Sequence, residues 1–388
     1  MKRRLYNGAD VSRALNIEEL REMARRRLPH FSFQYIDAGA EDEVTLVWNR
    51  KVFERWRFAP NTLVDTSART LEVPLYGVNI KLPLIIAPTG FNGLAWPKAD
   101  VLLARAAAAH GIPFTLSTFS TAKIEEVAEA GGRLWLQLYL LKNREIAKNL
   151  LARAAACGYE ALAVTSDANV PSGREWDQRS YRSPGKLTPR AWLDALMHPH
   201  WGMQILSNGM PQIANVIDFV PPEQQSTAKR SQFIASQVQR NIHWEDFKWL
   251  RDLWKGKLLL KGVLTPEDAE RAHAVGAEGV VLTNHGGRQL ESCISPMEVL
   301  PEVVRAVGNK MTVIVDSGFR RGGDVVKAMA LGAHAVMIGR ATLYGVAAAG
   351  EPGAKHALNL LTKEIDRTMG MLGRRSFTEI DGKILISN

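Results

Sequence analysis

The sequence is poor in the residues that build disulfide frameworks and metal sites. Only two cysteines, Cys157 and Cys293, occur in 388 residues. Their separation fits neither a disulfide scaffold nor the spacing of metal ligands, so we expect two reduced thiols and no metal. No run of 18 or more apolar residues is present, which excludes a membrane-spanning helix of ordinary length. The basic segment at residues 1–10 has no apolar stretch behind it and does not predict a signal peptide.

Two groups of ligand-binding motifs are also missing. No GxGxxG segment follows a predicted strand, which excludes a Rossmann site for a nicotinamide cofactor. No DNA- or RNA-binding signature accompanies the net charge of +9, so nucleic acid is not an expected partner. The charge instead suits an anionic ligand or an anionic membrane surface. A hydrophobic content of 46% with 23% charged residues indicates a globular protein with a large core.

The chain contains a repeating pattern of short apolar segments and amphipathic helices. Eight such units predict a (β/α)8 TIM barrel more readily than an open sheet. The predicted strands cover residues 82–88, 112–117, 133–140, 161–167, 257–263, 278–284, 311–318 and 333–340. Before them we predict a helical lead-in, with a helix over residues 17–27, and an outer strand pair formed by residues 55–60 and 71–83. Residues 1–388 are interpreted as a single domain.

A long insertion separates the fourth and fifth predicted strands. At roughly 90 residues this connection is far longer than an ordinary loop of such a barrel. Within it, residues 180–240 are assigned as a membrane-associating or lid segment, and their middle part, residues 187–222, is rich in Trp, Met, Ile and Pro and contains few acidic residues. The apolar set is Trp192, Trp201, Met203, Ile205 and Leu206, flanked by Arg182, Lys186 and Arg190. Aromatic and basic residues together favour contact with a membrane interface; a lid over the barrel and a subunit contact are the alternatives.

Polar side chains occur where nearly every predicted strand ends. After the sixth strand the chain reads Thr283-Asn284-His285, then two glycines and Arg288. Histidine can accept a proton near neutral pH, and the guanidinium of arginine fits a carboxylate. Because chemistry in such barrels takes place at the carboxyl ends of the strands, this turn is a candidate active site.

The last two strands are followed by segments that favour phosphate binding. Residues 316–323 combine Asp316 with glycines and arginines at the start of a helix, and Gly339-Arg340 follows the eighth strand. Free backbone N–H groups and arginines at these two loops form the phosphate site typical of the barrel. Flavin mononucleotide (FMN) fits this pattern better than a dinucleotide.

The ordered motifs resemble one known family. They are YIDAGAEDE, PTGFNG, LSTFST, LQLYL, TSD, LKGVL, TNHGGRQ, DSGFRRGGD and IGRATLYG. From residue 28 to residue 380 the chain is similar to the FMN-dependent α-hydroxy-acid oxidases and dehydrogenases, which include glycolate oxidase and the membrane-associated L-lactate and mandelate dehydrogenases. The resemblance implies oxidation of an L-2-hydroxy acid to the 2-oxo acid, with FMN as cofactor.

The resemblance also implies a role for each matching residue. His285 would take the substrate proton, Asp167 would stabilise the imidazolium, and Tyr139 would contact the substrate hydroxyl. The substrate carboxylate would be bound by Tyr35, Arg174 and Arg288. Lys261 would lie beside the flavin ring and stabilise its reduced form. The remaining cofactor contacts would come from Thr89, Gly90, Ser117, Gln137, Thr165, Thr283, Asp316, Gly318, Arg320, Gly339 and Arg340.

Some positions depart from the family pattern, and these bear on substrate and acceptor. Glycolate oxidase has Ala where this chain has Gly90, which favours an acceptor other than oxygen, and Phe119 replaces a Trp. One arginine of a GRRE-like motif is absent at residues 172–175, and many relatives have Ser at Thr283.

The membrane-associated relatives pass electrons to quinone. This implies a peripheral protein at the cytoplasmic face of the inner membrane, assembled as a homo-oligomer, often a tetramer. A soluble oxidase producing hydrogen peroxide is the alternative, and a membrane-binding scaffold with an inactive barrel is the alternative from another class.

Overall fold

A computed structural model describes residues 5–175, 179–183, 186–224 and 227–387. Eight parallel strands form a closed barrel in the order β10-β11-β12-β13-β4-β5-β6-β7, as predicted. These strands are β4 (Leu84–Ile86), β5 (Phe114–Ser117), β6 (Leu134–Leu138), β7 (Ala161–Thr165), β10 (Lys257–Val263), β11 (Gly279–Leu282), β12 (Thr312–Val315) and β13 (Ala335–Ile338). Nearly every strand residue is buried, because the barrel interior and the surrounding helices cover both faces of the sheet.

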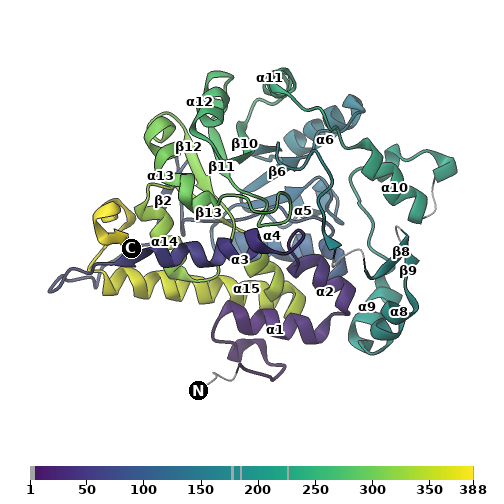
Figure 1. The fold of residues 1–388 in the computed structure, drawn as a ribbon, viewed down its shortest axis with the longest axis horizontal. Coiled ribbons are helices and arrows are strands. Elements are labelled where there is room, and N and C mark those ends of the chain that lie inside the picture. Colours follow the sequence, from purple (N-terminus) through teal and green to yellow (C-terminus); the bar gives the residue numbers. More distant parts are fainter. Residues whose placement is uncertain (1–4, 176–178, 184–185, 225–226, 388) are drawn as a thin grey trace.

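Helices surround the barrel, as Figure 1 shows. They are α4 (Ala99–Ala109), α5 (Ile124–Ala128), α6 (Arg144–Ala156), α11 (Trp244–Leu253), α12 (Pro266–Ala274), α13 (Pro296–Val307), α14 (Gly322–Ala330) and α15 (Arg340–Met371). Several begin at residues with capping side chains; the hydroxyl of Thr265, for example, accepts from the N–H of Asp268. Helix α15 is broken at Ala349 and Gly350, whose backbone angles are not helical.

The lead-in consists of α1 (Ile17–Arg27), α2 (His30–Asp37) and α3 (Val44–Lys51). Asn16 caps α1 by accepting from the N–H of Glu19, and Leu28 ends it. The predicted outer strand pair was wrong in its partners. Strand β1 (Trp56–Phe58) pairs with the C-terminal β14 (Leu385–Ser387), and β2 (Val73–Leu75) pairs with β3 (Val78–Ile80) in a hairpin. A contact between residues so far apart in the chain leaves no local sequence signal.

The insertion lies between β7 and β10. It contains β8 (Tyr181–Ser183), β9 (Lys186–Leu187), α8 (Pro189–Leu196), α9 (Pro199–Asn208) and α10 (Thr227–Gln237). Figure 1 places α8 and α9 at the edge of the molecule, below β8 and β9. Among the described residues, no helix has both the length and the apolar character needed to cross a bilayer.

Helices α8 and α9, which we call the hairpin, expose much of the predicted apolar set but not all of it. Trp192 is 59% exposed and Leu206 87%. Trp201 was predicted to belong to this surface, which is wrong. It is buried, its indole N–H donates to the carbonyl of Leu94 at 2.9 Å, and its ring packs edge-on against Phe31. Trp201 therefore attaches the hairpin to the barrel.

Candidate active site

The turn after β11 has an unusual backbone. His285 has a φ of 59°, and Gly286 and Gly287 continue at 67° and 74°. Left-handed angles are costly for a side-chain-bearing residue. Here they are stabilised by two hydroxyls: Thr283 accepts from the N–H of His285 at 3.0 Å, and Ser317 accepts from the N–H of Gly286 at 3.1 Å. The backbone that carries the imidazole is thus held in place.

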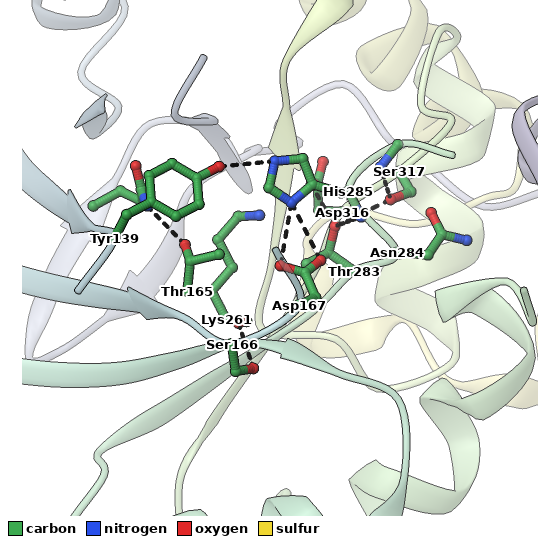
Figure 2. Close-up of polar contacts among 12 residues, drawn as sticks. Tyr139, Thr165, Ser166, Asp167, Lys261, Thr283, Asn284, His285, Asp316 and Ser317 are labelled. Atoms are coloured by element: carbon green, nitrogen blue, oxygen red, sulfur yellow. Dashed lines mark hydrogen bonds and ion pairs between the residues drawn. The ribbon is translucent and has the colours of Figure 1, made fainter. Parts of the chain in front are cut away.

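Three strand ends converge on this imidazole, as Figure 2 shows. Its Nδ1 lies 3.2 and 3.3 Å from the two carboxylate oxygens of Asp167, which follows β7. Its Nε2 lies 3.0 Å from the hydroxyl of Tyr139, which follows β6. A carboxylate beside Nδ1 favours a proton on that nitrogen, which makes Nε2 the proton acceptor.

The surroundings of these groups shift their pKa values. Burial lowers the pKa of His285 below its ordinary value; Lys261 and Arg288 act in the same direction, while Asp167 opposes them. Burial pulls the pKa of Asp167 upward, but the charges of His285 and Lys261 outweigh it and leave that pKa lowered. Burial raises the pKa of Tyr139. At neutral pH the site therefore holds a neutral imidazole, a carboxylate and a protonated phenol.

Two guanidinium groups gather around Tyr35. The Cζ atoms of Arg174 and Arg288 lie 5.6 and 5.7 Å from the centre of its ring. Arg288 also donates to the carbonyls of Ala38 (2.7 Å) and Tyr35 (2.8 Å), and the Tyr35 hydroxyl donates to the carbonyl of Gly90 at 3.3 Å. Two cations held by one aromatic ring form a surface that suits a carboxylate.

Most of the predicted site residues line one cavity of about 750 Å³. This size is in the range of small-molecule and cofactor sites. The predicted residues in its wall are Tyr35, Thr89, Gly90, Ser117, Tyr139, Arg174, Lys261, His285, Arg288, Asp316, Gly318, Arg320, Gly339 and Arg340. Gln137, Thr165, Thr283 and Asp167 are not part of the wall and lie behind it.

Two of these outer groups, Gln137 and Thr283, form hydrogen bonds with residues of the wall. The amide of Gln137 accepts from the hydroxyl of Ser117 at 3.1 Å and donates to that of Thr165 at 2.8 Å, across β5, β6 and β7. The hydroxyl of Thr283 donates to Asp316 at 2.8 Å while accepting from His285. Asp316 and the backbone of His285 are therefore joined through a single hydroxyl.

The side chain of Lys261 supports the expected anionic, ring-shaped ligand. Lys261 is only 3% exposed and lines the cavity. Within the described part of the chain, its ammonium has neither a hydrogen bond nor an ion pair. A buried cation without a partner is costly unless a ligand compensates it. The polar edge of a flavin fits this requirement.

The far end of the cavity fits a phosphate. Gly318 has a φ of 84°, and a Cβ there would collide with the carbonyl oxygen of Asn49, so only glycine is compatible. Burial lowers the pKa of Arg320, and the nearby cations Arg340 and Arg50 add to this effect. The first main-chain bond of α15 runs from Leu343 to Gly339, which leaves the N–H groups of residues 340–342 as donors at this helix end.

Arg340 differs in detail from the expectation. Its guanidinium donates to the carbonyls of Ile36 (2.9 Å), Gly286 (2.8 Å) and Ala38 (3.0 Å). These bonds join α2 to the turn that carries His285. The phosphate contact of Arg340 stays a prediction, with its backbone N–H as the available group.

Several wall residues were not predicted from the sequence. The insertion and the turn after β7 supply Val170, Ile213, Ile234, Val238 and Arg240. None belongs to a recognisable motif, and only the anomalous length of the insertion indicated that it could approach the barrel. No group of three or more metal-ligating side chains occurs among the residues described in the structure.

Comparison with known proteins agrees with this geometry. The family model described as FMN-dependent dehydrogenase matches residues 24–387. The chain is 46% identical to (S)-mandelate dehydrogenase of Pseudomonas putida, over 94% of this chain and 92% of the relative. It is 40% identical to L-lactate dehydrogenase of Pectobacterium atrosepticum, over 95% and 96%. A crystal structure of the monotopic membrane protein (S)-mandelate dehydrogenase superposes with a TM-score of 0.93 at 45% identity, covering 97% of this chain and all of the other. The chain belongs to the FMN-dependent dehydrogenase family.

Proposed function

We propose that this enzyme oxidises the L enantiomer of a 2-hydroxy acid with a large apolar side chain, of the mandelate type, to the 2-oxo acid. The observation that carries the proposal is the position of His285 between Asp167 and Tyr139, in one cavity with Arg174 and Arg288. The preference for a large side chain is supported by Phe119, Val170, Ile213, Ile234 and Val238 in the wall. The (S)-mandelate dehydrogenase similarity supports it further.

The residues divide the work by charge. Arg174, Arg288 and the hydroxyl of Tyr35 bind the substrate carboxylate and orient the α-carbon. Nε2 of His285 accepts one proton, from the α-carbon or from the hydroxyl, and Asp167 stabilises the imidazolium that forms. Tyr139 donates to the substrate oxygen as it becomes a carbonyl.

FMN supplies the redox chemistry by accepting the two electrons of the C–H bond that breaks. Lys261 would hold its polar ring edge, together with Thr89, Gly90 and Ser117, and Gln137 and Thr165 would support that wall. Asp316, with Thr283 behind it, would bind the ribityl chain. Gly318, Arg320, Gly339 and the backbone N–H of Arg340 would hold the phosphate.

The exposed apolar residues of the hairpin support peripheral membrane contact. Besides Trp192 and Leu206, the exposed residues there include Leu193, Leu196, Met197 and Met203, with Lys186 and Arg190 exposed before them. Apolar and basic side chains together bind an anionic bilayer surface. We extend the proposal to a homotetramer at the cytoplasmic face of the inner membrane, with quinone as electron acceptor.

Anaerobic mixing of the yellow holoprotein with hydroxy acids tests the reaction. (S)-Mandelate should bleach the flavin absorbance faster than L-lactate, and the (R) enantiomer should not bleach it. His285→Gln should bind FMN but lose the bleaching, because the proton acceptor is gone. Normal bleaching by this variant would refute the role of His285. Reoxidation by a quinone analogue, without peroxide in air, would distinguish the dehydrogenase from the oxidase.

A further inference from the structure

One part of the cavity wall ends in a cation that the proposed reaction does not use. Ile213, Ile234 and Val238 contribute apolar surface, and Arg240 lies in the same wall. All four belong to the segment inserted between β7 and β10. Arg240 is outside the cluster formed by Arg174, Arg288 and Tyr35, since neither a hydrogen bond nor a ring contact joins it to those described residues.

The backbone around Val238 explains why Arg240 faces the cavity. Val238 forms a β-bridge with Leu141, just after β6. The N–H of Lys142 donates to the carbonyl of Gln237 at 2.7 Å, and that of Gln239 donates to the carbonyl of Leu140 at 3.0 Å. In an extended segment, alternate side chains point to opposite sides.

Gln239 identifies the face of this segment that points away from the cavity. It is buried, and its amide donates to Asp246 of α11 at 3.0 Å. Gln239 thus points away from the cavity, whereas its neighbours Val238 and Arg240 both line it. The guanidinium of Arg240 therefore lies on the same face as the apolar side chain of Val238, next along the cavity wall.

The carboxylate that Gln239 contacts does not neutralise Arg240. Asp246 already accepts from Arg144, from Gln239 and from the N–H of His243. Within the described residues the guanidinium of Arg240 has no hydrogen bond or ion pair. Because Arg240 is exposed, it remains a hydrated cation at the rim of the cavity, able to exchange water for a ligand.

We propose that Arg240 is a specificity-determining residue that binds an acidic or hydrogen-bond-accepting group at the far end of the substrate side chain. This inference rests on the proposed function. The substrate class is an aryl 2-hydroxy acid with such a group on its ring. The apolar wall would contact the ring, Arg174 and Arg288 would bind the carboxylate common to all substrates, and Arg240 would bind the distal group. A charge-assisted hydrogen bond of this kind changes kcat/KM by about 10- to 100-fold.

The test compares three substrates that differ only at the para position: mandelate, 4-methylmandelate and 4-carboxymandelate. The wild-type holoenzyme should prefer the carboxy over the methyl compound by about tenfold or more in kcat/KM. Arg240→Gln should lose that preference and keep mandelate turnover within about twofold, because mandelate has no distal group. Arg240→Lys should retain part of the preference. Arg190→Gln, at an exposed arginine of α8 outside the cavity, is the matched control.

Binding of the 2-oxo products gives a readout that does not need turnover. Benzoylformate and 4-carboxybenzoylformate can be titrated against the flavin spectrum of the wild type and of Arg240→Gln. The proposal is supported if 4-carboxybenzoylformate binds more tightly than benzoylformate to the wild type but not to Arg240→Gln. This result would support the role of Arg240 even if no hydroxy acid were oxidised. A lack of oxidation would refute only the proposed function. Equal affinity of the wild type for the two products would overturn the role of Arg240. So would an equal loss of mandelate and 4-carboxymandelate turnover in Arg240→Gln, because Arg240 would then act on the common carboxylate.

Discussion

The hydroxyl of Tyr139 lies 3.0 Å from Nε2 of His285, while the carboxylate of Asp167 lies beside Nδ1 (Figure 2). The two ring planes are inclined by 27°, with centres 6.3 Å apart. Both nitrogens are therefore engaged before any substrate enters. A substrate hydroxyl that reaches Nε2 must replace or share the contact with Tyr139. The phenol is therefore close enough to donate a hydrogen bond to the substrate oxygen when the proton moves to His285.

Replacing Tyr139 with Phe should lower the rate of flavin bleaching about 100-fold or more, as the loss of one hydrogen bond to a developing charge does in other enzymes. Substrate KM should change little, because Arg174 and Arg288 still bind the carboxylate. Stopped-flow bleaching by (S)-mandelate measures the rate, and steady-state turnover with an artificial electron acceptor measures KM. Tyr159→Phe is the control: it removes a buried hydroxyl that donates to the carbonyl of Ile124, outside the cavity. Equal effects of the two substitutions would contradict the role of Tyr139.

The pH dependence of the reaction follows from the lowered pKa of His285. Only the neutral imidazole accepts a proton, so kcat/KM should be constant near neutrality and fall as the pH drops through that lowered pKa. Asp167 raises the pKa of His285; Asp167→Asn should therefore move the acid limb to lower pH and also reduce kcat, because the imidazolium loses its counter-charge. A pH profile of kcat/KM checks the shift. An acid limb that stayed in place or moved upward would contradict this electrostatic coupling.

Lys261 should matter for cofactor binding more than for the fold. In Lys261→Met the buried cation is removed at similar length, so the apoprotein should remain folded while FMN affinity falls about tenfold or more. The rise in Tm on adding FMN should then be smaller than in the wild type. Lys257→Met is the control on the same strand, because Lys257 lies over the ring of Tyr76 and outside the cavity. If FMN raised the Tm of Lys261→Met as much as that of the wild type, Lys261 would not be a cofactor-binding residue.

The barrel could be predicted from the sequence because each strand and helix carries its own local pattern. Apolar runs such as residues 161–165 are buried throughout, and polar residues at the strand ends indicated where the cavity opens. The pairing of β1 with β14 could not be predicted, because it joins segments more than 300 residues apart.

Within the site, residue types were easier to predict than orientations. The motif around His285 indicated the base, but not that the hydroxyl of Thr283 would connect the backbone N–H of His285 to Asp316. Arg340 was recognisable as a cation, yet its guanidinium is bound to three carbonyls. Trp201 and Trp192 look alike in the sequence, and only tertiary packing separates the buried ring from the exposed one. Arg240 carries no motif, so only the bridge at Val238 revealed its direction.

The hairpin should bind anionic vesicles through its exposed apolar residues. The double variant Trp192→Ser, Leu206→Ser should bind phosphatidylglycerol vesicles about tenfold or more weakly, because each side chain contributes on the order of 1–2 kcal/mol when buried in the interface. Flavin bleaching should be unchanged, since neither residue lines the cavity. Cosedimentation measures the binding.

The control for the hairpin variant replaces two apolar side chains of comparable exposure on another part of the surface. Val78 and Ile386 are 53% and 58% exposed on β3 and β14, and Val78→Ser, Ile386→Ser should leave vesicle binding unchanged. Added salt should weaken binding of both the wild type and the control, because Lys186 and Arg190 then attract the anionic surface less. If the two double variants bound equally, the apolar surface of the hairpin would be free for another role, such as contact between subunits. Analytical ultracentrifugation of both variants without lipid would test for contact between subunits. If the hairpin forms that contact, only the hairpin substitutions would reduce the mass of the assembly.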